Sequence, residues 1–273
     1  MSPLWRNRIG VELSPQRVAW VRMARGLPAN VIAKGFEDVT PQENEPLWQA
    51  ELTKLEQLLR GEGWKNADVT VVLSNHFVRY DCLPWNEAVT SDDEQIALAR
   101  HRLMQIYGAV AQTWAVRLSP AAKGAVRLIA AMDNILLEKL KAAVVEANLK
   151  LYSIQPCLMA SFNHFARNVT TDNSWFVVAE NGRFALALLR DGQWQRIRLR
   201  RGAGAAALHE WLERESLADG NAASSREVFL FGLDEREAVL PSYQLHRLEL
   251  SACRGYSPLT DTQYLMAMSG VAG

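Results

Sequence analysis

The pattern of hydrophobic and polar positions predicts a mixed α/β chain. Short runs rich in Val, Ile and aromatic residues are typical of strands, whereas apolar residues at three- and four-residue spacing are typical of helices. In the first part of the chain, the predicted strands are residues 9–13, 17–23, 31–36, 69–73, 77–83, 114–118, 126–132 and 151–154. The helices predicted there begin near Pro46, Ser91, Asp133 and Pro156. Ser91 and Glu94 form a capping box, which marks the start of the second of these helices.

A second strand-rich pattern begins after the polar stretch 168–173, which predicts a boundary between two domains, 1–167 and 168–273. The second domain has predicted strands at residues 175–179, 183–189, 195–199, 228–231 and 245–250, and predicted helices at 205–215 and 260–269. Asn181-Gly182 is a strong hairpin signal and predicts a type I′ turn. Both domains begin with strand, turn and strand. This internal repeat predicts duplicated subdomains that face each other across a cleft.

The charge balance gives no electrostatic argument for binding nucleic acid or an anionic membrane, because 30 Lys and Arg residues match 30 Asp and Glu residues. Three cysteines lie far apart at Cys82, Cys157 and Cys253, which argues against a disulfide framework or a zinc site and fits a reducing cytosol. No secretory signal opens the chain, and no apolar run reaches the roughly 20 residues that a membrane helix needs. We therefore expect a cytoplasmic protein that is peripheral to a membrane only through its partners.

Three segments of the chain carry a family resemblance. Residues 9–23 read IGVELSPQRVAWVRM, residues 71–85 read VVLSNHFVRYDCLPW, and residues 91–108 form the acidic-capped helix SDDEQIALARHRLMQIYG. Together they resemble the actin-like ATPase superfamily, and within it the branch of the type IV pilus protein PilM, the MSHA-pilus protein MshI and the cytoplasmic domain of the type II secretion protein GspL. The resemblance implies an α/β fold of duplicated actin-like (ribonuclease H-like) subdomains, with a small α/β subdomain inserted at about residues 69–155.

The resemblance also implies a nucleotide site, but the first hairpin departs from the pattern of active members. Active members have an aspartate and glycines there, so that backbone N–H groups bind phosphate and the carboxylate orients the waters of a magnesium ion. In this chain the acidic residue is Glu12, and Ser14 is followed by Pro15 at the turn. Pro15 has no N–H to donate.

Two further parts of the implied nucleotide site are also reduced. The second hairpin, which is a longer glycine-containing loop in active members, is here the tight turn of Glu180, Asn181 and Gly182. The adenosine region usually has paired glycines, whereas Gly232 stands between Phe231 and Leu233. We therefore expect a pseudo-ATPase without a required cofactor, whose remnant nucleotide residues are Glu12, Ser14, Glu180, Gly182 and Gly232. Binding of Mg-ATP without hydrolysis stays open.

Each remnant residue has a simpler interpretation. Glu12 and Glu180 could be solvated carboxylates at hairpin ends, Gly182 could serve only the turn, and Gly232 only a connection between a strand and a helix. The alternative function is an active Mg-ATP-binding ATPase of the same machinery, using Glu12 or Glu180. A third possibility is an unrelated two-domain α/β binding protein that shares only the strand order.

The function implied by the resemblance is that of a cytoplasmic scaffold or adaptor in the inner-membrane assembly platform of a type IV pilus or a type II secretion-like machine. PilM binds the cytoplasmic tail of an inner-membrane partner, and GspL docks the assembly motor. A PilN-like tail and the motor ATPase are therefore the expected partners. The implied groove lies beside the inserted subdomain, at residues 69–85 and the helix from Ser91, where a tail could add to an exposed strand. Trp85 is the candidate interface anchor.

A row of arginines is a second candidate partner site. Arg196, Arg198 and Arg200 alternate with Ile197 and Leu199, so they are predicted to lie on one face of a strand. Such a row could receive an acidic partner segment or a phosphate. A solvated outer strand face is the alternative.

Overall fold

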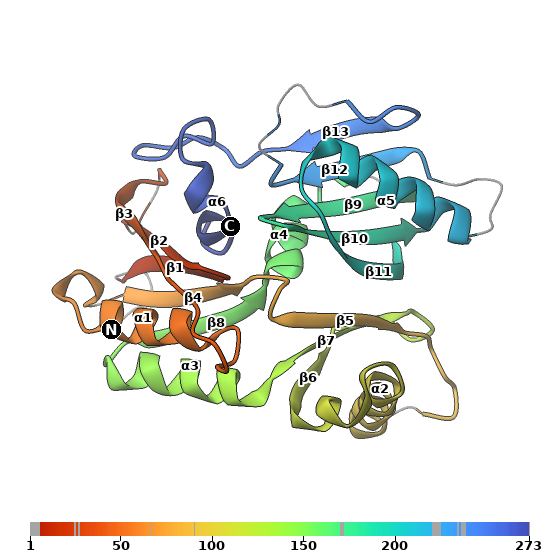
Figure 1. Cartoon of the computed structure of the whole chain (residues 1–273), viewed down its shortest axis with the longest axis horizontal. Helices are drawn as coiled ribbons and strands as arrows, with labels where there is room; N and C mark the ends of the chain where they lie inside the picture. The colour runs from red at the N-terminus through yellow and green to blue at the C-terminus, as the bar shows by residue number, and fades with distance from the viewer. Residues whose placement is uncertain are drawn as a thin grey trace. The chain divides into compact units, whose positions relative to one another are not determined.

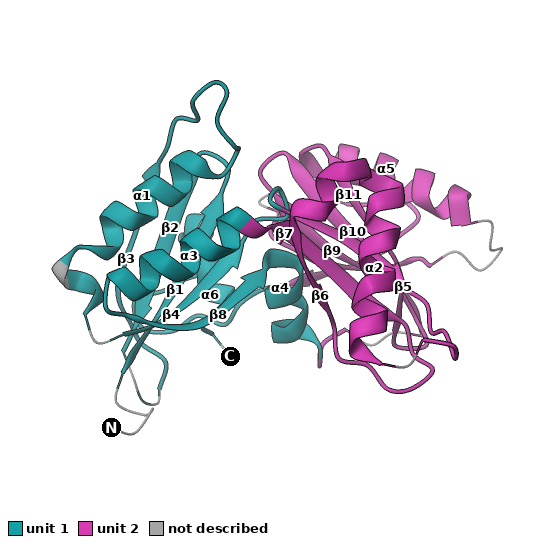
Figure 2. Ribbon diagram, turned by 90° about the horizontal axis from the view of Figure 1, so that it is seen from below, with its two compact units in different colours: residues 1–77, 135–166, 249–273 teal, residues 78–134, 167–248 magenta. Residues whose placement is uncertain are grey.

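The computed structural model describes residues 6–24, 26, 28–65, 67–89, 91–169, 172–219, 225–233, 235 and 239–272. The chain divides into two compact units, which Figure 2 shows in two colours. Unit 1 comprises Met1–Phe77, Ile135–Ala166 and Glu249–Gly273, and unit 2 comprises Val78–Asn134 and Arg167–Leu248. Among the described residues, the helices are all too short or too polar to cross a membrane.

Unit 1 is built on a five-stranded sheet with the order β3-β2-β1-β4-β8 (Figure 1). Its strands are β1 (Asn7–Ser14), β2 (Arg17–Met23), β3 (Val31–Asp38), β4 (Ala67–Leu73) and β8 (Lys150–Pro156). β1 is antiparallel to β2 and parallel to β4. The helices are α1 (Gln49–Leu59), α3 (Asn134–Glu146), α4 (Cys157–Phe165) and α6 (Leu265–Ser269), with short 3₁₀ turns η2 (Glu62–Trp64) and η4 (Thr262–Tyr264).

Unit 2 contains a second five-stranded sheet, with the order β11-β10-β9-β12-β13, and a three-stranded sheet, with the order β5-β7-β6. The larger sheet is formed by β9 (Asn173–Glu180), β10 (Arg183–Arg190), β11 (Gln193–Arg201), β12 (Glu227–Phe231) and β13 (Gln244–Leu248). The smaller sheet is formed by β5 (Val78–Leu83), β6 (Trp114–Leu118) and β7 (Arg127–Asp133). The helices are α2 (Asp92–Tyr107), the 3₁₀ segment η3 (Gly108–Thr113) and α5 (Gly204–Asp219).

The two five-stranded sheets have the same topology. In each, the first two strands form an antiparallel hairpin, the third strand extends the sheet beyond the second, and the fourth pairs in parallel with the first. The fifth strand pairs in parallel with the fourth. This shared order confirms the predicted duplication, because two identical five-strand orders do not follow from local pattern alone.

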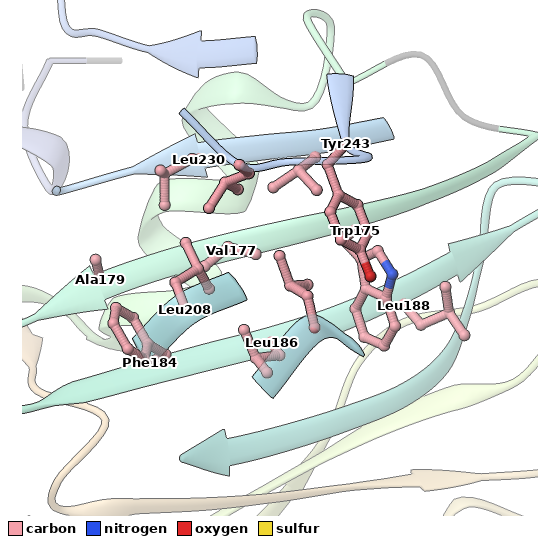
Figure 3. Close-up of a cluster of buried hydrophobic side chains, with 12 residues drawn as sticks. Trp175, Val177, Ala179, Phe184, Leu186, Leu188, Leu208, Leu230 and Tyr243 are labelled. Carbon is pink, nitrogen blue, oxygen red and sulfur yellow. The ribbon is translucent and has the colours of Figure 1, made fainter. Parts of the chain in front are cut away.

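The larger sheet of unit 2 buries one face under α5 (Figure 3). Side chains from neighbouring strands meet there in direct cross-strand pairs, Trp175 with Leu188, Val177 with Leu186 and Ala179 with Phe184. Leu208 and Leu212, four residues apart on α5, pack on them. Each large apolar side chain buried in this way contributes about 1.5–3 kcal/mol relative to leaving it exposed. This packing fixes the strands that end at the β9–β10 turn.

The C-terminal segment of unit 1 packs on the first sheet at Gly10. The carbonyl oxygen of Ala267 in α6 lies so close to Gly10 of β1 that a methyl group at this position would overlap it. The same segment is fixed to β3, because Lys34 Nζ donates to Asp261 Oδ2 at 2.6 Å and lies 5.5 Å from the ring centre of Tyr264. Residues 261–267 thereby pack on β1 and β3 of the first sheet, although they are more than 200 residues away in sequence.

Every strand predicted from the sequence is confirmed, with ends displaced by at most two residues. The helix expected from Pro46 begins at Gln49, and the closing helix expected at 260–269 is a 3₁₀ turn followed by α6. The capping box of Ser91 and Glu94 is formed.

The predicted domains 1–167 and 168–273, with an insertion at about 69–155, stay a prediction. The compact units are a different division, because residues 249–272 pack with the first sheet and β5, β6 and β7 pack with the second. β4, α3 and β8 belong to the first unit, so the part of 69–155 that forms a separate small sheet with α2 is 78–133. Thr170 and Thr171 at the predicted boundary lie outside the described residues.

Replacing Gly10 by alanine should weaken the packing of α6 on β1. We expect Gly10→Ala to lower the free energy of unfolding by about 2 kcal/mol, because the added methyl group forces backbone apart in a closely packed contact. Gly63→Ala is the matched control, since a methyl group there meets nothing within 4 Å. Chemical denaturation of both variants measures the effect, and equal stabilities would contradict the close approach.

Candidate functional site

The first predicted phosphate hairpin is the β1–β2 turn. Ser14 and Arg17 close the ladder, and Pro15 and Gln16 form the two-residue turn between them. Gln16 has a φ of 70°, so this turn has the φ signs of a type II turn, with proline at its first central position. The Ser14 hydroxyl donates to the carbonyl oxygen of Arg17 at 3.4 Å. Ser14 is therefore engaged within the hairpin itself.

The backbone N–H of Gln16 donates to Oε1 of Glu51 at 2.7 Å. Glu51 lies in the first turn of α1 and is fully buried, with a relative exposure of 0%. Its second carboxylate oxygen, Oε2, is buried without a hydrogen-bond partner in the structure. Of the two turn residues, one has no N–H and the other donates its N–H to the chain's own carboxylate.

Burial raises the pKa of Glu51 above its ordinary value of 4.5, although hydrogen bonds from the backbone of Gln16 and from its own backbone lower it. Glu51 was not among the predicted site residues, because it is 35 residues away in sequence from Gln16, which it contacts. The available signal was an acidic residue in the first turn of a helix that follows the third strand of the sheet.

Glu12 lies inside β1, two residues before the end of the strand. It pairs with Ala19 of β2 and Val72 of β4, and it is half-buried. Alternate residues of a strand share a face, so Glu12 and Ser14 lie on the face that Gly10 presents to α6. Glu12 is therefore within the sheet near its end, rather than at the tip of a loop.

The second predicted phosphate hairpin is the β9–β10 turn, closed by the pair of Glu180 and Arg183. Gly182 has a φ of 71°, whereas Asn181 is not among the residues with positive φ. The predicted type I′ turn is therefore wrong, because that turn needs positive φ at both central residues. A methyl group at Gly182 would meet nothing within 4 Å, so this glycine is explained by its φ. The Gly182 carbonyl oxygen accepts the N–H of Gly202 at 3.1 Å.

Gly232 follows β12 with a φ of 92°, a conformation that glycine adopts without strain. β12 is parallel to β9, with Phe231 opposite Val178, so both strands end at the same sheet edge. The structure thereby brings Glu180, Gly182 and Gly232 to one edge of unit 2. Glu12 and Ser14 lie together in unit 1.

The N-terminus of α5 is capped by an acidic side chain. The backbone N–H of Ala205 donates to Glu235 Oε2 at 3.0 Å. The neighbouring Gly204 has a φ of 79°, and a methyl group there would lie 2.6 Å from Glu235 Oε1. The start of a helix is a ready anion site, because its first N–H groups have no acceptor within the helix. Here Glu235 supplies that acceptor, and no sequence signal indicated it.

The predicted site residues that the structure describes form neither a metal site nor a set of free backbone N–H groups at Gln16 and Ala205. Among the residues that the structure describes, no set of three or more His, Cys, Asp and Glu side chains is placed to hold a metal ion. The N–H groups of Gln16 at the first hairpin and of Ala205 at the start of α5 each donate to a carboxylate of the chain. The residues present therefore fit a nucleotide phosphate poorly.

No family model and no curated protein sequence matches the chain. Solved structures do match it. The PilM–PilN type IV pilus biogenesis complex aligns over 96% of this chain and 94% of that chain, with 15% identity and a TM-score of 0.66. The cytoplasmic domain of EpsL, an inner-membrane component of the type II secretion system of Vibrio cholerae, aligns over 98% and 95%, with 12% identity and a TM-score of 0.58. A Bacteroides thetaiotaomicron protein of actin-like ATPase fold and unknown function aligns over 91% and 94%, with 9% identity and a TM-score of 0.60.

The chain has the actin-like fold. The expected resemblance is confirmed at this level, since the matching structures include members of the branch that the sequence indicated. At 9–15% identity the likeness extends to the fold alone. Within an actin-like fold, β1–β2 and β9–β10 are equivalent hairpins of the two duplicated sheets.

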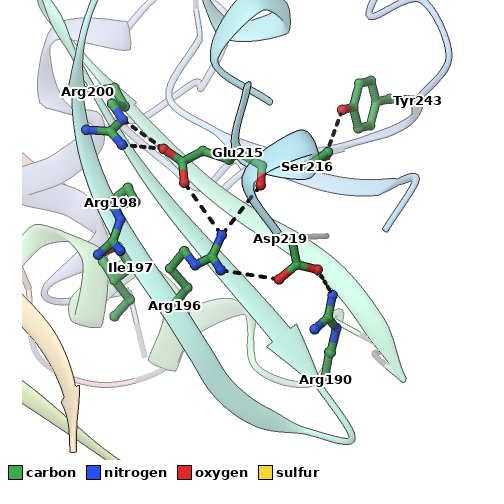
Figure 4. Close-up of polar contacts among 9 residues, drawn as sticks. All are labelled: Arg190, Arg196, Ile197, Arg198, Arg200, Glu215, Ser216, Asp219 and Tyr243. Atoms are coloured by element: carbon green, nitrogen blue, oxygen red, sulfur yellow. Dashed lines mark hydrogen bonds and ion pairs between the residues drawn. The ribbon is translucent and has the colours of Figure 1, made fainter. Parts of the chain in front are cut away.

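The actin-like chain uses two of the three predicted partner arginines inside unit 2 (Figure 4). Arg200 Nε donates to Glu215 Oε1 at 2.9 Å, and Arg196 lies 3.3 Å from Asp219 Oδ1. Arg190 also pairs with Asp219. Glu215 and Asp219 are one turn apart on α5 and their side chains are 5% and 8% exposed. These pairs tie β11 to α5.

Arg198, between them, donates to the carbonyl oxygen of Ile197 at 3.2 Å and is exposed. It also lies near Cys82 of β5. The pKa of the Cys82 thiol is raised to about 12, chiefly by burial and then by the charge of Asp81, while Arg102 and Arg198 act to lower it. Whether the arginine row also binds a partner stays a prediction.

The pairing of β4 and β5 limits where a partner tail could add a strand in the groove predicted at residues 69–85. β4 is hydrogen-bonded to β1 on one edge and to β8 on the other, so within the predicted groove at residues 69–85 this strand offers no edge to which a tail could add. β5 pairs with β7 on one edge and lies beside β11 on the other, with most of its residues buried. Trp85, just beyond β5, is half-buried and lines a shallow recess with Pro84, Val89 and Leu98.

The buried Glu51 predicts a pH effect on stability. Its pKa is raised in the folded state, so the folded protein holds a proton that the unfolded chain releases near pH 4.5. The stabilising contribution is therefore present at lower pH and is lost as pH rises through the folded pKa. From about pH 4 to about pH 7, the wild type should lose stability relative to Glu51→Gln. Denaturation at both pH values measures this. Glu56→Gln on the same helix is the control, and the same change in both variants would contradict the assignment.

The ion pairs of Glu215 predict a structural role for the arginine row. Glu215→Ala should lower the free energy of unfolding by about 2–3 kcal/mol, because Arg196 and Arg200 lose a buried carboxylate partner. Glu210→Ala, on the exposed side of α5 with a pair to Arg214, should change it by less than about 0.5 kcal/mol. Urea denaturation compares the two, and a small effect for Glu215→Ala would count against this role.

Proposed function

We propose that this actin-like chain is a cytoplasmic scaffold or adaptor in an inner-membrane assembly platform of the type IV pilus or type II secretion kind. The proposal is supported by the likeness of its whole fold to the PilM–PilN complex and to the EpsL cytoplasmic domain. MshI-like, PilM-like and GspL-like roles are all of this class. On this proposal the chain binds a partner's cytoplasmic tail and links it to the assembly motor, and its nucleotide site is degenerate.

The observation that best supports a degenerate nucleotide site is the hydrogen bond from the N–H of Gln16 to Glu51. Phosphate groups bind at turns and helix starts through backbone N–H groups that point at the anion. At the β1–β2 turn, Pro15 offers no donor and the Gln16 donor meets a carboxylate. A polyphosphate approaching this turn would have to displace a buried negative charge or lie against it. The capping of Ala205 by Glu235 repeats this arrangement at α5.

The expected partner is a PilN-like inner-membrane protein, since one matching structure is a PilM–PilN complex. Trp85 is the candidate docking point, because its indole is half-exposed beside Pro84 and Leu98 and a partner side chain could pack against it. With no strand edge open at β4, such a tail would be held by side-chain contacts there more than by strand addition. The chain would then be peripheral to the inner membrane through this partner.

The nucleotide part of the proposal is tested by thermal unfolding with Mg-ATP and Mg-ADP at millimolar concentration. A ligand at about 100 times its dissociation constant adds roughly 2.7 kcal/mol of stability, which is readily seen as a rise in Tm. We expect no rise beyond that given by magnesium chloride at equal ionic strength, and no phosphate release. A rise accompanied by phosphate release would replace the scaffold with the active ATPase.

The partner part needs a separate measurement. The tagged chain, purified from membranes of its own cells, should carry an integral membrane protein with a short cytoplasmic tail. Deletion of that tail should abolish co-purification, and Trp85→Ala should reduce it. Recovery that is unchanged without the tail would contradict the adaptor role.

A further inference from the structure

β3 is the outermost strand of the five-stranded sheet in unit 1 (Figure 1). β2 pairs with one of its edges, and among the described residues the other edge is bridged only at Asn30, by Arg254. The N–H of the neighbouring Val31 donates to the carbonyl oxygen of Arg254 at 2.8 Å. Beyond this point, residues 32–38 have no second strand beside them in the part of the chain that the structure describes.

The register of β3 on β2 determines which backbone groups face this open edge. The N–H of Val39 donates to the carbonyl oxygen of Gln16 at 2.8 Å, and hydrogen-bonded and non-hydrogen-bonded pairs alternate along an antiparallel ladder. Asp38, Phe36 and Lys34 therefore occupy non-hydrogen-bonded positions opposite β2. Their N–H and C=O groups point away from β2, toward the open edge. A row of such groups is a template for pairing with another strand.

The side chains of β3 protect this edge only weakly. A lysine on an edge strand usually discourages pairing. Here Lys34 Nζ donates to Asp261 Oδ2 at 2.6 Å and to the carbonyl oxygen of Gly255 at 3.0 Å, so its charge is matched within unit 1. Two large apolar side chains of the strand are exposed, Ile32 at 48% and Phe36 at 40%. β3 is thus suited to receive a further strand.

We propose that β3 pairs with β3 of a second copy of this chain, in an antiparallel arrangement centred on Phe36. In this register Phe36 stands opposite Phe36 of the second copy, and Lys34 stands opposite Asp38 of the second copy. By symmetry the Lys34–Asp38 pair occurs twice. Because these are the residues whose backbone groups point outward on both chains, each pair can exchange two N–H···O=C bonds. The inference is independent of the proposed adaptor function.

The charges of β3 favour a second copy as the occupant and favour this register. Opposite charges on directly opposite residues stabilise a sheet, and like charges destabilise it. A register centred on Lys34 or on Asp38 would place like charges opposite each other. Asp38 pairs with Arg17 but its side chain is 67% exposed, and the Lys34 ammonium has three donors, of which two have acceptors in unit 1. Both groups can therefore accept the additional contact.

Sedimentation equilibrium of the whole chain, at concentrations up to millimolar, tests the pairing. We expect a reversible equilibrium between one and two chains, which is weak because a single short strand pair buries less surface than a stable dimer needs. Asp38→Lys should weaken dimerisation about tenfold, since it places like charges opposite each other at both Lys34 positions. Glu146→Lys, an equal charge change at an exposed position of α3 in the same unit, should change it by less than about twofold.

A proline at the centre of the contact tests the backbone pairing separately from the charges. Phe36→Pro removes an N–H that points away from β2, so the ladder within unit 1 keeps its hydrogen bonds, and proline is tolerated at such edge positions. We expect this variant to stay monomeric at concentrations where the wild type dimerises. Its far-UV circular dichroism should match that of the wild type.

Exchange of the two charges tests the register. Lys34→Glu and Asp38→Lys should each dimerise poorly alone, whereas an equimolar mixture should recover dimers, because each substituted position then meets an opposite charge on the other chain. A wild type that stays monomeric throughout would overturn the proposal, as would dimers that persist in both Asp38→Lys and Phe36→Pro. If Lys34→Glu unfolds through loss of its contact with Asp261, the comparison of Asp38→Lys with Glu146→Lys still decides.

Discussion

The structure depends on hydrogen-bond acceptors for the backbone N–H groups at its turns and helix starts. Turn and helix-start N–H groups have no partner within their own element. In this chain Gln16 finds its acceptor in Glu51 and Ala205 finds one in Glu235. Satisfying these donors internally stabilises the hairpin and the helix without a ligand. On the proposed function, the same contacts occupy two N–H donors that a phosphate would otherwise need.

The duplicated sheets place the β1–β2 and β9–β10 turns at matching topological positions, but the two turns differ in the side chains around them. In unit 1, the β1–β2 turn contacts a buried carboxylate. In unit 2, the β9–β10 turn is closed by Glu180 and Arg183, and Arg183 stands opposite Arg201 of β11. β11 contributes Arg196 and Arg200, which pair with Asp219 and Glu215 of α5.

The strands and most helices could be predicted from sequence, because each depends on local periodicity within about ten residues. The hairpins at Pro15-Gln16 and Asn181-Gly182 were found for the same reason, although the turn type at Asn181 was not. The partners of these turns could not be found, since Glu51 is 35 residues from Gln16 and Glu235 is 30 from Ala205. One signal was available and unused: Glu215 and Asp219, four residues apart on a helix, predict an acidic stripe able to match arginines on a neighbouring strand.

At the first hairpin, the carboxylate of Glu51 accepts the hydrogen bond from the N–H of Gln16. A crystal structure of the protein grown with magnesium and a non-hydrolysable ATP analogue at millimolar concentration tests it most directly. We predict that Glu51 remains hydrogen-bonded to the N–H of Gln16 and that no phosphate lies at the β1–β2 turn. A nucleotide phosphate on the Gln16 N–H, with Glu51 displaced, would contradict the account.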